Sequence, residues 1–340
     1  MSEHGSAVET PDLDVADLLG LALARRLSSV FGAARGEPSL IVHLSDSGAD
    51  LADPNSPAER GDLDTLPAVV IGVGRLDQPS AALVDVIVGS TKEARTLAGV
   101  VRQRPLASVA LALLLRHDGE RSIAAGLIAE STTYSMMQAG TEFASWRAGR
   151  PAPGGTRHPA SEPPVLVDID GMTTLISLNR PTRHNAVDLA LSEHLVEALT
   201  AAITRPGSPI VLSGRGPSFC SGGDLDEFGS FPDPVIAHTA RLSRSAGHLI
   251  AMMAPRVEVQ LHGACIGAGI ELAAFAGTVI ARDDTRISLP ELSLGLVPGA
   301  GGTVSLPRRI GRHRTALLAL RGDVLDAATA LEWGLVDRVV

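Results

Sequence analysis

Two stretches of the chain place a strand-like apolar run before a turn of small residues and a helix-like pattern. The run 210–213 leads to the turn 219–224, and the run 256–261 leads to the turn 263–271. Both turns are rich in glycine or other small residues, so the backbone there can approach a ligand without obstruction by a Cβ atom. Alternating strand, turn and helix predicts an α/β fold.

Two glutamates lie at the end of these small-residue turns or after them. Glu271 ends the turn 263–271, and Glu291 lies in the segment 289–295. A single glutamate in a helix is usually a solvated surface charge, but apolar neighbours surround both of these. Two carboxylates that reach one ligand can serve as an acid and a base. The pair therefore indicates acid/base chemistry.

The bulk properties exclude several classes of function. With 340 residues and 45% hydrophobic content, the chain can form one large domain or two ordinary ones. A net charge of -9 argues against general binding of nucleic acids or anionic membranes, although a local arginine cluster around a phosphate is still permitted. Residues 1–14 are polar and acidic, unlike a signal peptide, and no apolar run is long enough to span a bilayer. We therefore expect a cytoplasmic protein.

The chain has only two cysteines, Cys220 and Cys265. Two are too few for a disulfide framework, and they lack metal-ligand spacing. We expect both to be small packing residues, and we expect no metal site.

Repeated proline and glycine in residues 151–164 indicate a linker between two units. The predicted division is therefore 1–150, linker 151–164 and 165–340. After the linker, the runs 165–169 and 173–178 predict a β-hairpin. Apolar residues at helical spacing then predict a helix over 189–204.

The N-terminal part carries no catalytic motif. It predicts a helix over 13–31, strands over 40–44 and 68–73, and an acidic loop over 46–64.

Five segments in order give the second half of the chain a recognisable pattern. They are 178–181 with 185–186, then 219–224, 263–271, 289–295 and 298–303. Over residues 165–340 the chain resembles the crotonase (enoyl-CoA hydratase/isomerase) superfamily. The resemblance implies a superhelix of ββα units, an acyl-CoA substrate, and assembly as a homotrimer or a dimer of trimers.

The resemblance also implies roles for four positions. The backbone N–H groups of Gly223 and Ala268 would form an oxyanion hole for the thioester oxygen. Ala268 departs from the glycine that is usual there, but a backbone donor does not require glycine. Glu271 would mainly orient and deprotonate water, and Glu291 would mainly protonate C2.

Coenzyme A recognition is implied for the segments 180–186 and 221–225. The candidate substrate-binding residues are Arg183, His184, Ala186, Ser221, Asp224 and Leu225. Arg183 is the best candidate for a phosphate or adenine contact, with an ordinary surface arginine as the alternative. We expect Asp224 to fix its loop rather than to react.

The chain departs from the family at its end, because crotonases normally continue with several helices after a segment like 334–340. Conversely, residues 83–88 echo 335–340, and residues 91–150 look similar to the absent helical tail. One hypothesis is that the tail has been relocated to the front of the chain, as in a circular permutation. The alternative is an unrelated helical extension.

Two glutamates favour hydration of a 2-enoyl-CoA, a lyase reaction that needs no metal or redox cofactor. Another crotonase reaction is the nearest alternative: isomerisation, thioester hydrolysis or decarboxylation. A second alternative is a non-catalytic acyl-CoA-binding scaffold subunit.

A dinucleotide site is not expected, because residues 267–269 lack the third glycine of that fingerprint. Ser218 and Ser221 likewise miss the serine-hydrolase elbow.

Overall fold

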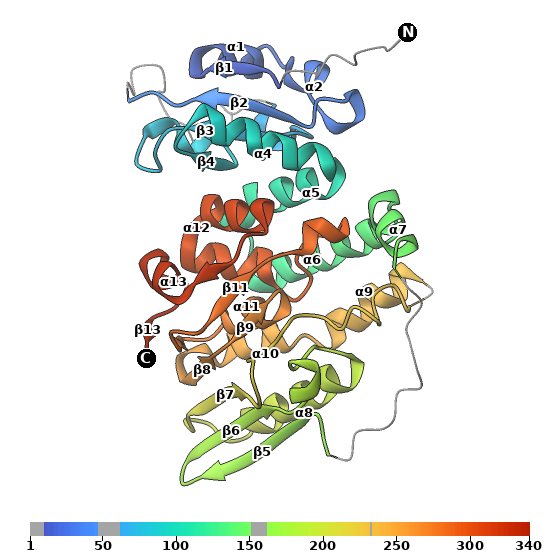
Figure 1. Cartoon of the computed structure of the whole chain (residues 1–340), viewed down its shortest axis with the longest axis vertical. Helices are drawn as coiled ribbons and strands as arrows, with labels where there is room; N and C mark the ends of the chain where they lie inside the picture. Colours follow the sequence, from blue (N-terminus) through green and yellow to red (C-terminus); the bar gives the residue numbers. More distant parts are fainter. Residues whose placement is uncertain (1–9, 47–61, 151–161, 232) are drawn as a thin grey trace. The chain divides into compact units, whose positions relative to one another are not determined.

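The computed structural model describes residues 10–46, 62–150, 162–231 and 233–340 (Figure 1). The chain forms two compact units, Met1–His117 and Asp118–Val340. Most of the predicted linker and most of the predicted acidic loop lie outside the described residues.

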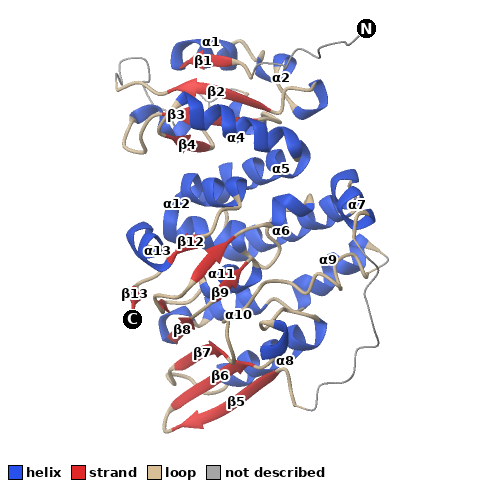
Figure 2. Ribbon diagram, viewed as in Figure 1, coloured by secondary structure: helices blue, strands red, loops and turns tan. Residues whose placement is uncertain are grey.

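The first unit contains a four-stranded parallel sheet in the order β1-β2-β3-β4 (Figure 2). Its strands are β1 (Asp12–Asp14), β2 (Ser39–His43), β3 (Val69–Val73) and β4 (Val86–Val88), and its α-helices are α1 (Val15–Leu23), α2 (Leu27–Val30), α4 (Thr91–Gln103) and α5 (Pro105–Arg116). The two central strands are almost fully buried, as expected for a parallel sheet covered on both faces. The strands predicted at 40–44 and 68–73 are confirmed as β2 and β3.

The single helix predicted over 13–31 is wrong. Leu13 belongs to β1, where it pairs with Val42, and α1 begins only after Asp14, whose carboxylate accepts a hydrogen bond from the Asp17 N–H (2.8 Å). The helix then ends before Arg25, which has a left-handed φ of 51°. Such a conformation interrupts a helix, and hydrophobic periodicity alone does not reveal it.

Helices α4 and α5 meet at a bend of 112°. Pro105 is the first residue of α5, a position that suits proline because the N–H it lacks would have no intrahelical partner. Within the described residues, no single helix has both the length and the apolar composition for crossing a membrane, and only this bent pair passes when its two helices are counted together.

The second unit contains two sheets. A six-stranded sheet has the order β13-β10-β8-β7-β6-β5, and a three-stranded sheet has the order β12-β11-β9. Its strands are β5 (Val165–Asp170), β6 (Thr173–Leu178), β7 (Ile210–Gly214), β8 (Val257–Leu261), β9 (Ala264–Ile266), β10 (Thr278–Ala281), β11 (Arg286–Ser288), β12 (Leu325–Asp326) and β13 (Arg338–Val339). Its α-helices are α6 (Ile123–Gln138), α7 (Thr141–Ala148), α8 (Leu189–Ile203), α9 (Pro234–Ser243), α10 (Ala246–Met252), α11 (Ala268–Ala273), α12 (Gly302–Arg321) and α13 (Ala327–Trp333).

The local predictions for this unit are confirmed. The hairpin is β5 and β6, which pair antiparallel, and the predicted helix is α8. The runs 210–213 and 256–261 form β7 and β8, which are parallel neighbours. With its helices and mostly parallel strand pairs, the unit has the α/β fold that the sequence predicts.

Gly263 carries the chain from the larger sheet into the smaller one. It lies between β8 and β9, its φ is 53°, and a Cβ atom there would come 2.1 Å from the Pro217 carbonyl oxygen. Only glycine fits such a crossing. The crossing sends β9 directly into Gly267 and α11, the helix that carries Glu271.

Candidate active site

A cavity of about 280 Å³ lies in the second unit. Its lining includes five of the predicted site residues: Gly223, Asp224, Ala268, Glu271 and Glu291. The other five, Arg183, His184, Ala186, Ser221 and Leu225, do not line it. Helices α6, α8, α9, α10 and α11 contribute further walls, together with the loop 227–231 and residues 299–301.

Glu271 is bound by the turn that leads into α12. Its side chain is 1% exposed, and its Oε2 atom accepts hydrogen bonds from the N–H groups of Ala300 (2.7 Å) and Gly302 (2.8 Å). We call residues 299–303 the α12 turn. Its amides belong to the N-terminal end of a helix, where unpaired donors and the helix dipole favour a carboxylate.

The α12 turn also binds a carboxylate that the sequence analysis did not single out. Glu130 of α6 is 1% exposed, and its Oε1 atom accepts from the Gly301 N–H (2.7 Å). Its Oε2 atom accepts from both the N–H (2.8 Å) and the hydroxyl (2.7 Å) of Thr303. The signal available in the sequence was a single acidic residue in a stretch of apolar and small residues, 123–131, within the segment that resembles the family tail.

Glu291 has a different environment. It is 8% exposed, and within the described structure its buried Oε2 atom has no hydrogen-bond partner. Its Oε1 atom lies against Gly267, where a Cβ atom would come only 2.3 Å from it. Burying a carboxyl oxygen without a hydrogen-bond partner costs free energy. Glu291 lies in the cavity wall, where a ligand or a water molecule can supply the missing hydrogen bond.

The surroundings act differently on the pKa values of Glu271 and Glu291. Burial raises the pKa of Glu271, and the backbone N–H groups of the α12 turn partly offset that rise. Burial, and then the charges of Glu271 and Glu130, raise the pKa of Glu291 well above its ordinary value. Glu271 is therefore the better candidate for an ionised base, and Glu291 is the better candidate for a protonated acid.

Two amides face the cavity without a partner from the described part of the chain. The N–H groups of Gly223 and Ala268 donate no hydrogen bond to another described residue. Their turns lie side by side, since Cys220 and Cys265 form a parallel bridge between them. A Cβ atom on Gly269 would come 2.6 Å from the Cys220 carbonyl oxygen, so glycine permits this approach.

Both cysteines are buried and free, as the packing role predicts. Burial is the main cause that raises the pKa of each thiol, which disfavours the reactive thiolate.

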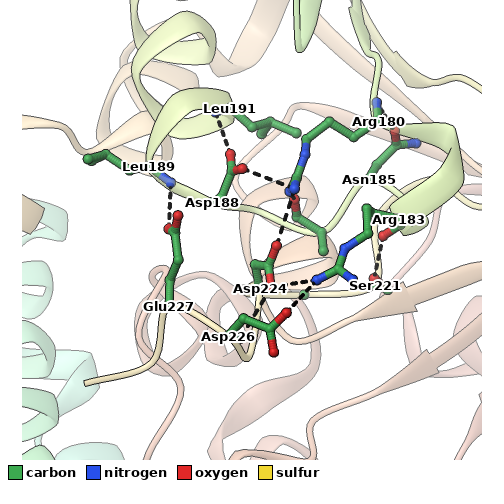
Figure 3. A network of polar contacts seen from close by, with 12 residues as sticks. Arg180, Arg183, Asn185, Asp188, Leu189, Leu191, Ser221, Asp224, Asp226 and Glu227 are labelled. Atoms are coloured by element: carbon green, nitrogen blue, oxygen red, sulfur yellow. Dashed lines mark hydrogen bonds and ion pairs between the residues drawn. The ribbon is translucent and has the colours of Figure 1, made fainter. Parts of the chain in front are cut away.

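An ion-pair network holds the Gly223 turn in place (Figure 3). Asp224 is 2% exposed and pairs with Arg180 (3.2 Å) and Arg183 (3.1 Å). Arg180 also pairs with Asp188 (3.0 Å), whose other carboxylate oxygen accepts from the Leu191 N–H at the start of α8. Asp224 thus lies where a loop-fixing residue is expected. Arg180 lies in the segment 178–181 of the family pattern, but its role in fixing the Gly223 turn was not predicted from the sequence.

The predicted coenzyme A residues surround this network. The Arg183 side chain is 50% exposed, and it pairs with Asp226 (2.8 Å) as well as with Asp224. His184 adopts a left-handed conformation and its Nδ1 atom lies 2.9 Å from the Ser218 hydroxyl. Ala186 is buried and Leu225 is exposed. The Ser221 N–H donates to the His184 carbonyl. Their contacts with coenzyme A remain predictions.

Helix α7 supports the loop that closes one side of the cavity. Phe143 stacks on Trp146 (5.4 Å between ring centroids), and Trp146 contacts Phe228 (6.3 Å). Arg147 donates to the Gly229 carbonyl oxygen. Both Phe228 and Gly229 line the cavity, so residues before the predicted core help to shape it.

Arg241 fixes helix α9 to helix α6. The Arg241 guanidinium lies 4.7 Å from the centre of the Tyr134 ring, and its Nε atom donates to the Ser131 hydroxyl (3.1 Å). Desolvation lowers the pKa of Arg241, while Tyr134 and Glu130 act in the opposite direction. All four residues line the cavity.

We predict that Arg180 and Arg183 contribute very differently to stability. Arg180→Met leaves the buried carboxylate of Asp224 and the partly buried carboxylate of Asp188 without their shared cation, which should cost about 3–5 kcal/mol. Arg183→Met removes a half-exposed partner and should cost about 1 kcal/mol or less. Urea denaturation, followed by circular dichroism, measures both variants. Equal losses would contradict the structural role assigned to Arg180.

Comparisons with known proteins agree on one family. The enoyl-CoA hydratase/isomerase family model matches residues 169–340. A probable enoyl-CoA hydratase of Mycobacterium bovis is 35% identical over 179 residues, which cover 52% of this chain and 68% of that protein. The 2,3-dehydroadipyl-CoA hydratase of Escherichia coli is 36% identical over 178 residues, with the same coverage of 52% and 68%. Among solved structures, an enoyl-CoA hydratase from Thermoplasma volcanium has 35% identity and a TM-score of 0.48, covering 53% of this chain and 72% of that one. The match to the family model over half of the chain and the identity with the two relatives show that the chain belongs to the enoyl-CoA hydratase/isomerase family.

Proposed function

We propose that this protein hydrates a 2-enoyl-CoA thioester to a 3-hydroxyacyl-CoA. The observation that carries the proposal is the composition of the cavity wall. Two buried glutamates, Glu271 and Glu291, line the same cavity as the two unpartnered amides of Gly223 and Ala268. Family membership and the names of the relatives support an acyl-CoA substrate.

In the proposed reaction the thioester oxygen accepts hydrogen bonds from the Gly223 and Ala268 N–H groups. These donors stabilise the negative charge that collects on that oxygen as the enolate develops. Each donor of this kind is typically worth about 100-fold or more in rate. The Asp224 network fixes the Gly223 turn, and the Gly267 N–H next to Ala268 donates to the Ser288 carbonyl (2.9 Å), so the two amides need little reorganisation when the charge appears.

The two glutamates then carry the proton transfers. The Glu271 carboxylate takes a proton from water while the water oxygen bonds to C3, and the electrons of the C2–C3 double bond move towards the thioester. The carboxylic acid of Glu291 gives its proton to C2, which collapses the enolate. Water is thus added across the double bond, and exchange of protons with solvent restores Glu271 to its ionised form and Glu291 to its protonated form.

We also propose the cofactor requirement, the coenzyme A contacts, the cellular location and the assembly of the protein. Both protons pass through carboxylates, so we propose that no metal or redox cofactor takes part. Residues 180–186 and 221–225 remain the proposed coenzyme A contacts. A cytoplasmic location and a trimer or pair of trimers also remain proposals. The alternatives are isomerisation, thioester hydrolysis or decarboxylation by the same site, and a non-catalytic acyl-CoA-binding role.

We predict that neither catalytic glutamate can be replaced by its amide. Glu271→Gln and Glu291→Gln keep the shape of the side chain but remove the base or the acid, so each should lower kcat by about 100-fold to 10,000-fold. Loss of the 2-enoyl-CoA absorbance with crotonyl-CoA and a longer enoyl-CoA measures the rate. Glu332→Gln, an exposed position on α13, is the matched control and should retain the native rate.

The possible outcomes separate the alternatives. Loss of activity in both variants supports the two-glutamate hydratase. Binding of acyl-CoA by the native protein without any hydration would favour another reaction of the family or a binding role. Absence of both binding and hydration would overturn the acyl-CoA assignment.

We predict a bell-shaped dependence of kcat/KM on pH. Glu271 must be ionised, so activity should rise as pH increases through its raised pKa. Glu291 must be protonated, so activity should fall as pH increases through its own pKa, which burial and neighbouring charge raise further. Initial rates across a pH series test this, with the two limbs describing the coupled pair rather than single residues. An activity that keeps increasing through alkaline pH would contradict Glu291 as the acid.

A further inference from the structure

Four consecutive amides of the α12 turn, from Ala300 to Thr303, alternate between two carboxylates. Ala300 and Gly302 donate to Glu271. Gly301 and Thr303, the residues between and after them, donate to Glu130. Consecutive amides of this turn thus face two acids that come from different helices, α11 and α6.

We propose that Glu130 is a positioning residue of the active site, which orients the α12 turn so that the Ala300 and Gly302 amides are directed at Glu271. This inference rests on the proposed function of Glu271 as the base. Both carboxylate oxygens of Glu130 are occupied by the turn, so Glu130 acts through the turn rather than on the substrate.

The geometry explains why one carboxylate depends on the other. These amides lie at the start of a helix, where they have no partner within the helix itself. Without Glu130, the buried N–H groups of Gly301 and Thr303 would be left unpaired, which is costly. The turn could recover partners only by rotating, and a rotation of its peptide units would withdraw the Ala300 and Gly302 amides from Glu271.

The close approach of α6 to α12 makes this contact specific. A Cβ atom on Gly126 would come 2.8 Å from Cγ2 of Val304, so α6 can approach α12 this closely only with glycine at that position. On another side, Ser131 of α6 accepts a hydrogen bond from Arg241 of α9. Helix α6 is therefore held from two directions, and Glu130 has little freedom to follow a displaced turn.

Glu130 lies outside the part of the chain that the family model matches, which begins at residue 169. The proposed positioning group is thus supplied by a helix that precedes the matched core in the chain. The isolated segment 165–340 would contain Glu271 and the α12 turn but would lack the acid that binds two of the four amides.

The test replaces Glu130 by glutamine in the full-length protein. Glu130→Gln retains the size of the side chain but exchanges one acceptor oxygen for an NH₂ group, which cannot accept from the turn. We expect kcat for enoyl-CoA hydration to fall by about 100-fold through misplacement of the base, while KM changes less than about threefold. Thr303→Val removes only the hydroxyl bond to Glu130 and should lower kcat by a smaller factor. Thr132→Ala, at an exposed position of the same helix, should leave both constants unchanged.

Hydrogen–deuterium exchange supplies a readout that does not need activity. In Glu130→Gln, peptides containing residues 299–303 should exchange faster, including the Ala300 and Gly302 amides that Glu130 does not touch. Native kcat in the Glu130→Gln variant, or unchanged exchange at Ala300 and Gly302, would overturn the proposal. If the native protein hydrates no enoyl-CoA, the proposed function fails, and the exchange at those two amides alone decides the role of Glu130. If Glu130→Gln does not fold, the same measurements on Thr303→Val decide it.

Discussion

The binding of two buried carboxylates by one helix-initiating turn is the interaction on which the rest of the site depends. Four successive amides, from Ala300 to Thr303, bind Glu271 on α11 and Glu130 on α6. Neither acid has a cation within ion-pair distance among the described residues, so the amides supply the compensation that burial requires. The turn thereby joins three helices, and it fixes the cavity wall before any ligand arrives.

The polar groups of the site that have partners among the described residues differ in role from those that have none. Asp224, Glu130 and the bound oxygen of Glu271 have internal partners, and each of them holds a backbone segment in place. The Gly223 and Ala268 amides and the Glu291 Oε2 atom have no partner among the described residues. An uncompensated polar group costs free energy, and a fold retains few of them. Their convergence on a single cavity is what distinguishes a site from ordinary packing.

Sequence reasoning found the parts of the site that depend on local pattern. A small-residue turn after a strand indicated Glu271, the family resemblance indicated Gly223 and Ala268, and the strand-like runs 165–169 and 173–178 located the hairpin. It missed Glu130, whose partner Gly301 is 171 positions away, because no local pattern encodes a contact of that range. It also missed the end of α1, where Arg25 adopts a positive φ without the glycine or asparagine that would have announced it.

The same burial that suits the site to the proposed proton transfer lowers the stability of the folded chain when the three acids ionise. Burial is the first cause that raises the pKa of Glu130, Glu271 and Glu291, so the folded state holds their protons more tightly than the unfolded chain does. Their contribution to stability is therefore greatest at low pH and declines as pH rises from the ordinary pKa of a glutamate through the raised values. Amide donors limit this cost for Glu130 and Glu271, whereas nothing in the described structure compensates the free oxygen of Glu291. The group that remains uncompensated is the one assigned to deliver a proton, because only an acid that resists ionisation still carries its proton when substrate binds.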